Sequence, residues 1–294
     1  MIPAAAISAR QPSVLSYLNP WRLARDLLAH WELIRQFTAR EVLGRYKGSY
    51  LGLFWSVATP LLMLGVYTFV FTVILTGGKW GNLAPRDASP AAEAHPADFL
   101  LNMLCGLILF NIFAETISRA PTLVLSNINY VKRVVFPLHI LPISVLLGNL
   151  IYGLTSLVLL LAALLYFTHG VPWTIVLFPL ILIALLMLCT GLAWFLASLG
   201  VFFRDIQHAV IVVVQLLFFM TPIFYPAEMI PERYRWVLML NPLAMLVTDA
   251  RRVMIEGVLP VWSRYGIVLA ISFVVMLAGY AWFMRTRRWF ADVI

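Results

Sequence analysis

The chain has 294 residues, of which 62% are hydrophobic and only 12% are charged. Soluble domains are about 45–50% apolar and about 25% charged, so this composition argues against a water-soluble protein. The formal net charge of +8 suits either nucleic acid or a lipid surface, and the placement of the basic residues decides between these partners.

The N-terminal region predicts one amphipathic helix. Residues 1–18 show no regular pattern, and no basic start followed by an apolar core indicates a cleavable signal peptide. Asn19-Pro20 has the pattern of an N-cap followed by proline at the first helical position. Over Trp21–Phe37 the apolar residues recur every three or four positions. This period predicts a helix that lies at the membrane surface or packs on the protein itself.

A second helix start follows directly. Thr38-Ala39-Arg40-Glu41 matches the capping box, in which a hydroxyl and a carboxylate each satisfy the free amide of the other residue. We therefore predict a short basic helix over Ala39–Lys47, with Gly48-Ser49 as the joint before the first membrane span.

Six apolar blocks are long enough to cross a bilayer, which requires about 20 mostly apolar residues in a helix. Their long apolar runs differ from the polar–apolar alternation of a membrane β-barrel. The sequence therefore predicts an all-α integral membrane protein with six transmembrane helices. The predicted spans are Leu51–Thr76, Phe99–Arg119, Ile143–Phe167, Thr174–Gly200, Gln207–Tyr225 and Tyr265–Met284.

The connecting segments differ in character. Gly77–Asp98 is rich in glycine, alanine and proline and predicts an irregular outer loop. Pro121–Pro142 contains polar caps, a Lys-Arg pair and three prolines, which predict a short helix parallel to the membrane. Pro226–Arg264 is too long for a turn and too interrupted for a span, so we predict a re-entrant hairpin of two short helices between spans five and six. Asn241-Pro242 within it repeats the N-cap pattern.

Basic residues precede the first span, follow the last span and occupy the loops after spans two and four. Positive charge favours the cytoplasmic side, so we predict that both termini are cytoplasmic. Lipid head groups then explain the net charge better than nucleic acid does. Residues 1–50 would form a cytoplasmic N-terminal segment and residues 51–294 the transmembrane domain.

The sequence offers no catalytic or metal-binding constellation. Cys105 and Cys189 fall within predicted spans, which is typical of small buried hydrophobic residues. The five histidines are scattered over both predicted sides of the membrane, so we expect them not to form one metal site. They are His30, His95, His139, His169 and His208.

A phosphate-binding loop is also missing from the pattern. Gly77-Gly78-Lys79 is followed by Trp80 instead of serine or threonine, and the upstream glycine is absent. No segment outside the spans has the length of a nucleotide-binding domain. Any hydrolysis of ATP would therefore need another subunit.

Glu115 is the clear ionisable residue within a predicted span, where a charge costs about 2.5–3.5 kcal/mol on insertion scales. Arg119 lies four residues later, so we predict an ion pair within one helix. This pair either anchors the end of span two or forms a polar point on a transport path. One acid is too few for a proton relay, which disfavours an ion-coupled secondary transporter.

Aromatic residues make up 14% of the chain. Tryptophans near the span ends fit the aromatic belts of membrane interfaces. A second group lies in or beside spans one, two and five, where the rings either pack on lipid and helices or line a channel. With the acid of span two, the candidate channel-lining residues are Trp55, Tyr67, Phe71, Phe110, Phe113, Glu115, Phe218 and Tyr225.

Four stretches carry a resemblance to a known family. They are RYKGSYLGLFWSVATPLLMLGVYTFVF (45–71), NYVKRVVFPLHILP (129–142), LGVFFRDIQ (199–207) and MTPIFYPAEMIPERYRWVLMLNPL (220–243). In amino-acid sequence and in order along the chain they resemble the permease subunits of type-2 ATP-binding-cassette exporters. The resemblance is strongest to the permeases for O-antigen, capsular polysaccharide or teichoic acid. The resemblance covers roughly residues 20–290.

The resemblance implies a transport subunit that is not itself an enzyme. It implies a homodimer with one channel between the two copies, and two copies of a separate ATPase that holds ATP and magnesium, with no cofactor in this chain. The substrate would be a lipid-linked polysaccharide, which crosses the bacterial cytoplasmic (inner) membrane over the aromatic rings.

The resemblance also implies roles for the segments predicted above. Trp21–Phe37 would be the interface helix and Ala39–Lys47 the gate helix, with candidate residues Trp31, Arg40, Glu41, Arg45, Tyr46 and Lys47. Asn127–Phe136 would be the coupling helix and Arg204-Asp205 a second contact with the ATPase. The candidate coupling residues are Asn127, Tyr130, Lys132, Arg133, Arg204 and Asp205. The hairpin after span five would cap the outer mouth, and the first outer loop is longer than the resemblance leads us to expect.

Three alternatives remain open at this stage. A permease of the same class could export drugs or lipids instead of glycans. A secondary transporter would need no ATPase. A membrane-embedded transferase would need clustered acids or histidines at one membrane face, which the sequence does not present.

Overall fold

The computed structural model describes residues 17–46, 54–70, 96–131, 136–225 and 230–294. Every regular element within these ranges is a helix, which confirms the predicted all-α class for this part of the chain. Phe71, Lys47, Lys132, Arg133 and residues 77–95 of the predicted outer loop lie outside the described residues, as does the side chain of Tyr46.

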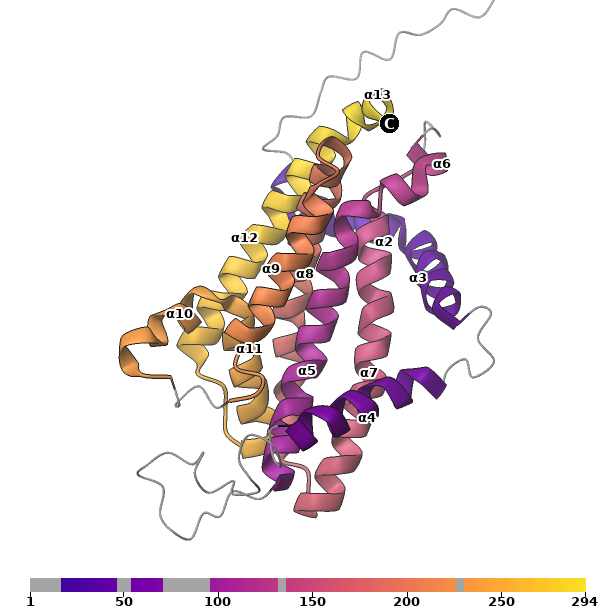
Figure 1. The fold of residues 1–294 in the computed structure, drawn as a ribbon. Helices are drawn as coiled ribbons and strands as arrows, with labels where there is room; N and C mark the ends of the chain where they lie inside the picture. Colours follow the sequence, from indigo (N-terminus) through magenta and orange to yellow (C-terminus); the bar gives the residue numbers. More distant parts are fainter. Residues whose placement is uncertain (1–16, 47–53, 71–95, 132–135, 226–229) are drawn as a thin grey trace, which may run out of the picture.

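Four stretches of helix are long and apolar enough to cross a membrane, and they match predicted spans two, three, four and six. Their longest elements are α5 (Pro96–Arg119), α7 (Ile140–Thr168), α8 (Phe178–Phe202) and α12 (Trp262–Thr286), and they form the upright bundle of Figure 1. Continuous apolar sequence without an internal break explains their length.

The predicted first and fifth spans correspond to shorter helices. α4 (Phe54–Thr68) and α9 (Ile206–Met220) have 15 residues each, fewer than the roughly 20 that a straight crossing needs. α9 runs alongside α5 and α8, whereas α4 lies across α7 (Figure 1). The total of six spans therefore stays a prediction.

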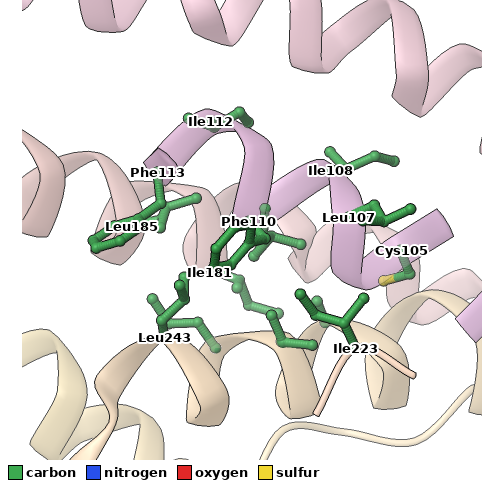
Figure 2. Close-up of a cluster of buried hydrophobic side chains, with 14 of the residues drawn as sticks. Cys105, Leu107, Ile108, Phe110, Ile112, Phe113, Ile181, Leu185, Ile223 and Leu243 are labelled. Carbon is green, nitrogen blue, oxygen red and sulfur yellow. The ribbon is translucent and has the colours of Figure 1, made fainter. Parts of the chain in front are cut away.

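α5 is the central helix of the bundle, although its sequence is the least apolar of the predicted spans. Of its most apolar window, 72% is buried inside the protein, against 17% for α7. Figure 2 shows its side chains packed against α8, against Leu243 of α11 (Pro242–Arg251) and against Ile223. Neighbouring helices surround most of α5, whereas its polar residues Asn111 and Glu115 are exposed and line a cavity.

α8 and α12 pack at backbone contact. A methyl group added to Gly191 would overlap the carbonyl oxygen of Val275, and one added to Gly279 would overlap that of Gly191. Small residues allow helix backbones to approach this closely in membrane proteins. The pair forms the most tightly joined wall of the bundle.

The N-terminal helices correct one prediction. α2 (Pro20–Ala29) begins as expected, because the Asn19 side chain accepts a hydrogen bond from the amide of Trp21 at 2.9 Å. The break, however, falls at His30, and α3 (Trp31–Tyr46) continues through Thr38. The predicted division into Trp21–Phe37 and Ala39–Lys47 is therefore wrong.

The predicted capping box fails because Thr38 and Glu41 make other contacts. Thr38 is buried within α3, and its hydroxyl caps no amide. Glu41 forms an ion pair with α5 instead of folding back on its own helix. His30 ends α2, and its Nδ1 lies 2.8 Å from the Asp26 carbonyl oxygen.

Two short α-helices lie in the described part of the segment between α9 and α12, and a re-entrant hairpin there stays a prediction. They are α10 (Arg235–Leu240) and α11, and the Asn241 side chain caps α11 at the amide of Leu243, 3.0 Å away. Buried Arg251 at the end of α11 donates to the carbonyl oxygens of Asn102 and Ile223, at 3.1 and 2.7 Å. α11 is thus attached to the start of α5 and to the segment after α9.

The segment after α5 consists of η3 (Ala120–Thr122), η4 (Leu125–Asn127) and α6 (Ile128–Val131). α6 lies at the end of the bundle that also carries α2 and α13 (Phe290–Val293), opposite the α10–α11 hairpin (Figure 1). The predicted coupling helix Asn127–Phe136 is helical over α6, and residues 132–135 lie outside the described ranges.

Candidate functional site

Two ion pairs join α3 to α5. Glu41 and Arg45 lie one turn apart on α3, and Glu115 and Arg119 lie one turn apart on α5. Arg119 pairs with Glu41, and Arg45 Nη2 lies 3.0 Å from Glu115 Oε2. The two helices therefore run antiparallel. The predicted ion pair between Glu115 and Arg119 within one helix is wrong, because α3 supplies a closer partner to each of these two residues.

Asn149 of α7 links Arg45 to the buried part of the protein. Its Oδ1 accepts a hydrogen bond from Arg45 Nη2 at 2.5 Å, and its Nδ2 donates to the hydroxyl of Thr116 at 2.9 Å. Asn149 is only 3% exposed, whereas the Glu115 side chain is 54% exposed. An exposed ion pair contributes about 0–1 kcal/mol, so the buried amide is the stronger determinant of the geometry.

Tyr152 lies one turn further along α7 and completes the arrangement. Its hydroxyl donates to the carbonyl oxygen of Val42 at 2.9 Å, and the Arg45 guanidinium lies 4.4 Å from its ring centroid. Gly148 allows α3 to come this close, because a Cβ there would lie 2.9 Å from Glu41 Cγ. We call this set the polar junction; its residues are Glu41, Arg45, Glu115, Arg119, Asn149 and Tyr152.

A cavity of about 550 Å³ opens beside the polar junction, between α4 on one side and α5 with α7 on the other. Trp55, Tyr67 and Phe218 contribute aromatic rings to its wall, and Arg45 and Asn149 contribute polar atoms. A second hollow of about 490 Å³ lies along the ion pairs and is lined by Arg40, Glu41, Gly44, Arg45, Glu115 and Arg119.

The predicted channel-lining residues that the structure describes, which are all but Phe71, fall into two groups. Trp55, Tyr67, Glu115 and Phe218 line the cavity. Phe110, Phe113 and Tyr225 do not. Phe110 and Phe113 are each 4% exposed within the core, where the Phe110 ring centroid lies 4.9 Å from that of Phe218 (Figure 2 labels both core rings). Tyr225 donates to the Phe219 carbonyl oxygen at 2.9 Å.

An aromatic cluster ties α3 to the predicted coupling segment. The Tyr130 ring stacks on Phe136 with centroids 4.5 Å apart, and Phe37 of α3 lies 5.4 Å from each of them. Arg40 Nη1 donates to the Tyr130 hydroxyl at 2.8 Å. α6 and the residue Phe136 are therefore packed directly against α3 through aromatic rings.

Of the other predicted coupling residues, the structure describes Asn127, Arg204 and Asp205, and these lie at the same end of the bundle. Arg204 and Asp205 are exposed in the tight turn between α8 and α9. Asn127 donates to the Leu123 carbonyl oxygen at 2.9 Å. Trp31, at the start of α3, is 55% exposed.

Asn149, Tyr152 and Thr116 are functional candidates that the sequence pattern did not reveal. An amide within the otherwise apolar span three was the available signal, because a buried amide in a membrane helix needs a partner. The five histidines are scattered along the sequence, whereas the structure places His30 and His139 with ring centroids 5.5 Å apart. Burial lowers the pKa of His139 to about 4, although the Asp26 carboxylate opposes this shift.

The four long apolar helices, with a cavity beside them, are typical of a helical membrane protein. Residues 32–255 match the ABC-2 type transporter family. The chain belongs to this family, as the resemblance predicted. It is an integral membrane permease subunit, and the family implies an ATP-binding-cassette system with an ATPase partner.

Curated relatives extend the match over nearly the whole chain. The O-antigen export system permease protein RfbA of Myxococcus xanthus is 30% identical over 275 residues, which cover 93% of this chain and 99% of the relative. RfbA of Klebsiella pneumoniae is 26% identical over 270 residues, covering 90% and 95%. The polysialic acid transport protein KpsM of Escherichia coli is 26% identical over 259 residues, covering 85% and 91%.

Proposed function

We propose that this chain is the channel-forming subunit of an ATP-driven exporter that moves a lipid-linked polysaccharide across the bacterial cytoplasmic membrane. The observation that carries this proposal is the end-to-end similarity to permeases named for O-antigen export and polysialic acid transport. O-antigen, capsule and related polymers share the chemistry of long hydroxylated chains.

The cavity suits such a substrate. The rings of Trp55, Tyr67 and Phe218 offer flat apolar faces to sugars, and Asn149 and Arg45 add hydrogen-bonding groups at one end. A polymer must slide, so repeated weak contacts serve it better than a deep site that holds one residue. None of this requires bond-making chemistry in the permease itself.

The proposed assembly is a homodimer with two ATPase subunits. α4 crosses the side of the bundle (Figure 1). The cavity lies between α4 and the bundle, so a second copy would close it into a channel. α4 and α9 would be spans one and five, α10 and α11 the re-entrant hairpin at the outer mouth, and the end with α2, α6 and α13 would face the cytoplasm with both termini.

The contacts support one route for coupling. ATP binding to the partner would close the ATPase pair and push on the Asn127–Phe136 segment and the Arg204-Asp205 turn. The Tyr130 cluster would pass this movement to α3. α3 would then shift the polar junction, which forms one end of the cavity. In this scheme α3 serves as both interface helix and gate.

Reconstitution with the ATPase subunit tests the substrate class. The purified complex in liposomes should hydrolyse ATP faster when lipid-linked glycan is added, and hydrophobic drugs should have no such effect. Stimulation by drugs alone would favour the drug or lipid exporter instead. A monomer that carries solute along an ion gradient without ATPase would overturn the proposal.

Charge reversal at the coupling surface tests the mechanism separately. Asp205→Arg, and Lys132→Glu combined with Arg133→Glu, should reduce export while membrane insertion stays intact. Normal export with both sets of changes would contradict the coupling scheme but would leave the exporter class untouched.

A further inference from the structure

Three potential metal ligands meet where α2 ends and α7 begins. Asp26 lies in the last turn of α2, His30 follows that helix, and His139 immediately precedes α7. One ligand atom from each lies within 4.8 Å of the others. The transport proposal gives this cluster no role.

Two of the three separations between these ligands are close to those that one ion requires. His139 Nε2 lies 3.2 Å from Asp26 Oδ2, and His30 Nδ1 lies 3.4 Å from Asp26 Oδ1. Two ligands that each bind tetrahedral zinc at about 2.0–2.2 Å are about 3.3–3.6 Å apart. Both measured separations are close to this value, one to each oxygen of Asp26, and the ligand atoms of the two histidines lie within 4.8 Å of each other.

His139 supplies an independent observation. It is 1% exposed, and neither of its ring nitrogens has a partner with hydrogen-bond geometry among the described residues. Trp194 Nε1 donates to the His139 carbonyl oxygen at 2.8 Å and so holds the backbone in position. Buried polar atoms without partners are rare in native proteins, and an ion bound to Nε2 would satisfy one of them.

The surroundings include the supporting contact that metal sites use. The Tyr280 hydroxyl of α12 donates to Asp26 Oδ2 at 2.7 Å. Hydrogen bonds of this kind orient carboxylate ligands. His30 Nδ1 also lies 2.8 Å from the Asp26 carbonyl oxygen, so binding through Nδ1 would exchange that hydrogen bond for a bond to the metal.

We propose that Asp26, His30 and His139 bind a divalent transition-metal ion, with zinc as the best fit and water as the fourth ligand. Two imidazoles and one carboxylate are a ligand set that zinc commonly takes, and harder ions such as magnesium prefer oxygen alone. The ion clamps α2 to the start of α7. Because α3 follows α2 directly, this site sets how firmly the N-terminal helices are held against the bundle.

The test uses the full-length chain in detergent, purified with a tag that contains no histidine and stripped of metal with a chelator. Zinc per chain is measured by elemental mass spectrometry after equilibrium dialysis, and thermal unfolding is followed with and without zinc. We expect one zinc per chain and a rise in Tm. Cobalt in place of zinc should give the visible absorption bands of a tetrahedral nitrogen–oxygen site.

The matched variants are His30→Gln and Asp26→Asn, which alter partly exposed ligands, and His208→Gln, which alters an exposed histidine on α9. The first two should lose the bound zinc and the rise in Tm, and His208→Gln should retain both. Equal zinc binding in all four proteins, or none in the wild type, would overturn the site. Neither result would bear on glycan export, since no transport is measured.

Discussion

Arg40 of α3 donates a hydrogen bond to the hydroxyl of Tyr130 of α6 across 2.8 Å, and its guanidinium lies 4.3 Å from the Phe37 ring centroid. The residue after Arg40 is Glu41, which pairs with Arg119 of α5. One turn of α3 therefore connects the segment predicted to touch the ATPase with the polar junction beside the cavity.

This connection predicts a coupling defect in Tyr130→Phe. The substitution removes the hydrogen bond and keeps the stacked rings, and a hydrogen bond contributes about 0.5–1.5 kcal/mol net. We expect glycan export per ATP hydrolysed to fall by about two- to tenfold, with normal assembly of the complex. Arg35→Ala, which alters an exposed arginine of α3 paired within its own helix, is the control and should leave export unchanged. Wild-type coupling in Tyr130→Phe would remove this hydrogen bond from the mechanism.

The antiparallel ion pairs predict rescue by charge exchange. Glu41→Arg places like charges on α3 and α5 and should lower both Tm and export, because Arg119 then faces a cation. The double variant Glu41→Arg with Arg119→Glu should recover most of the lost Tm. Thermal unfolding of the three proteins in detergent measures this, and a double variant no more stable than Glu41→Arg would show that the pairing is not the relevant contact.

The buried amide predicts a larger effect from a nearly isosteric change. Asn149→Leu leaves the Arg45 guanidinium and the Thr116 hydroxyl without their partner. Removing one member of a buried hydrogen-bonded set costs about 1–3 kcal/mol, so we expect a clear fall in Tm. Ser156→Ala on the same helix lines the cavity and should change Tm little. Similar Tm values for the two variants would contradict the anchoring role of Asn149.

The contact between α8 and α12 predicts intolerance of a single methyl group. Gly279→Ala would press its Cβ against the Gly191 carbonyl oxygen, and the backbone cannot move aside without separating the helices. Overpacking of this kind typically costs about 1–3 kcal/mol. Gly266→Ala on the same helix meets nothing within 4 Å and should be tolerated. Loss of detergent-stable protein in Gly279→Ala alone is the expected outcome, and equal stability of the two would refute the close packing.

Much of the fold was predictable because its signals are local. The caps at Asn19 and Asn241 depend on a side chain and an amide two residues away, and both are confirmed. The long apolar helices follow from uninterrupted composition over one stretch of chain. The Thr38–Glu41 motif was equally local and still failed, because packing buried Thr38 and gave Glu41 a partner on another helix.

The site was less predictable for the same physical reason. The sequence placed Trp55, Tyr67 and Phe218 in a group with Phe110 and Phe113, since all five are aromatic and lie within predicted spans. Only the packing of α5 at the centre of the bundle separates the rings that face the cavity from those that lie in the core.

By itself, the sequence determined that this protein is an all-α membrane permease of the ABC-2 type. Composition, periodicity and family motifs can all be read without knowing which residues are in contact. The tertiary structure alone decided that Glu115 binds Arg45, that Asn149 joins α7 to α3, and that His30 approaches His139. These relationships depend on which faces of the helices pack together. Contacts between residues far apart in the chain leave no local sequence pattern from which they could be predicted.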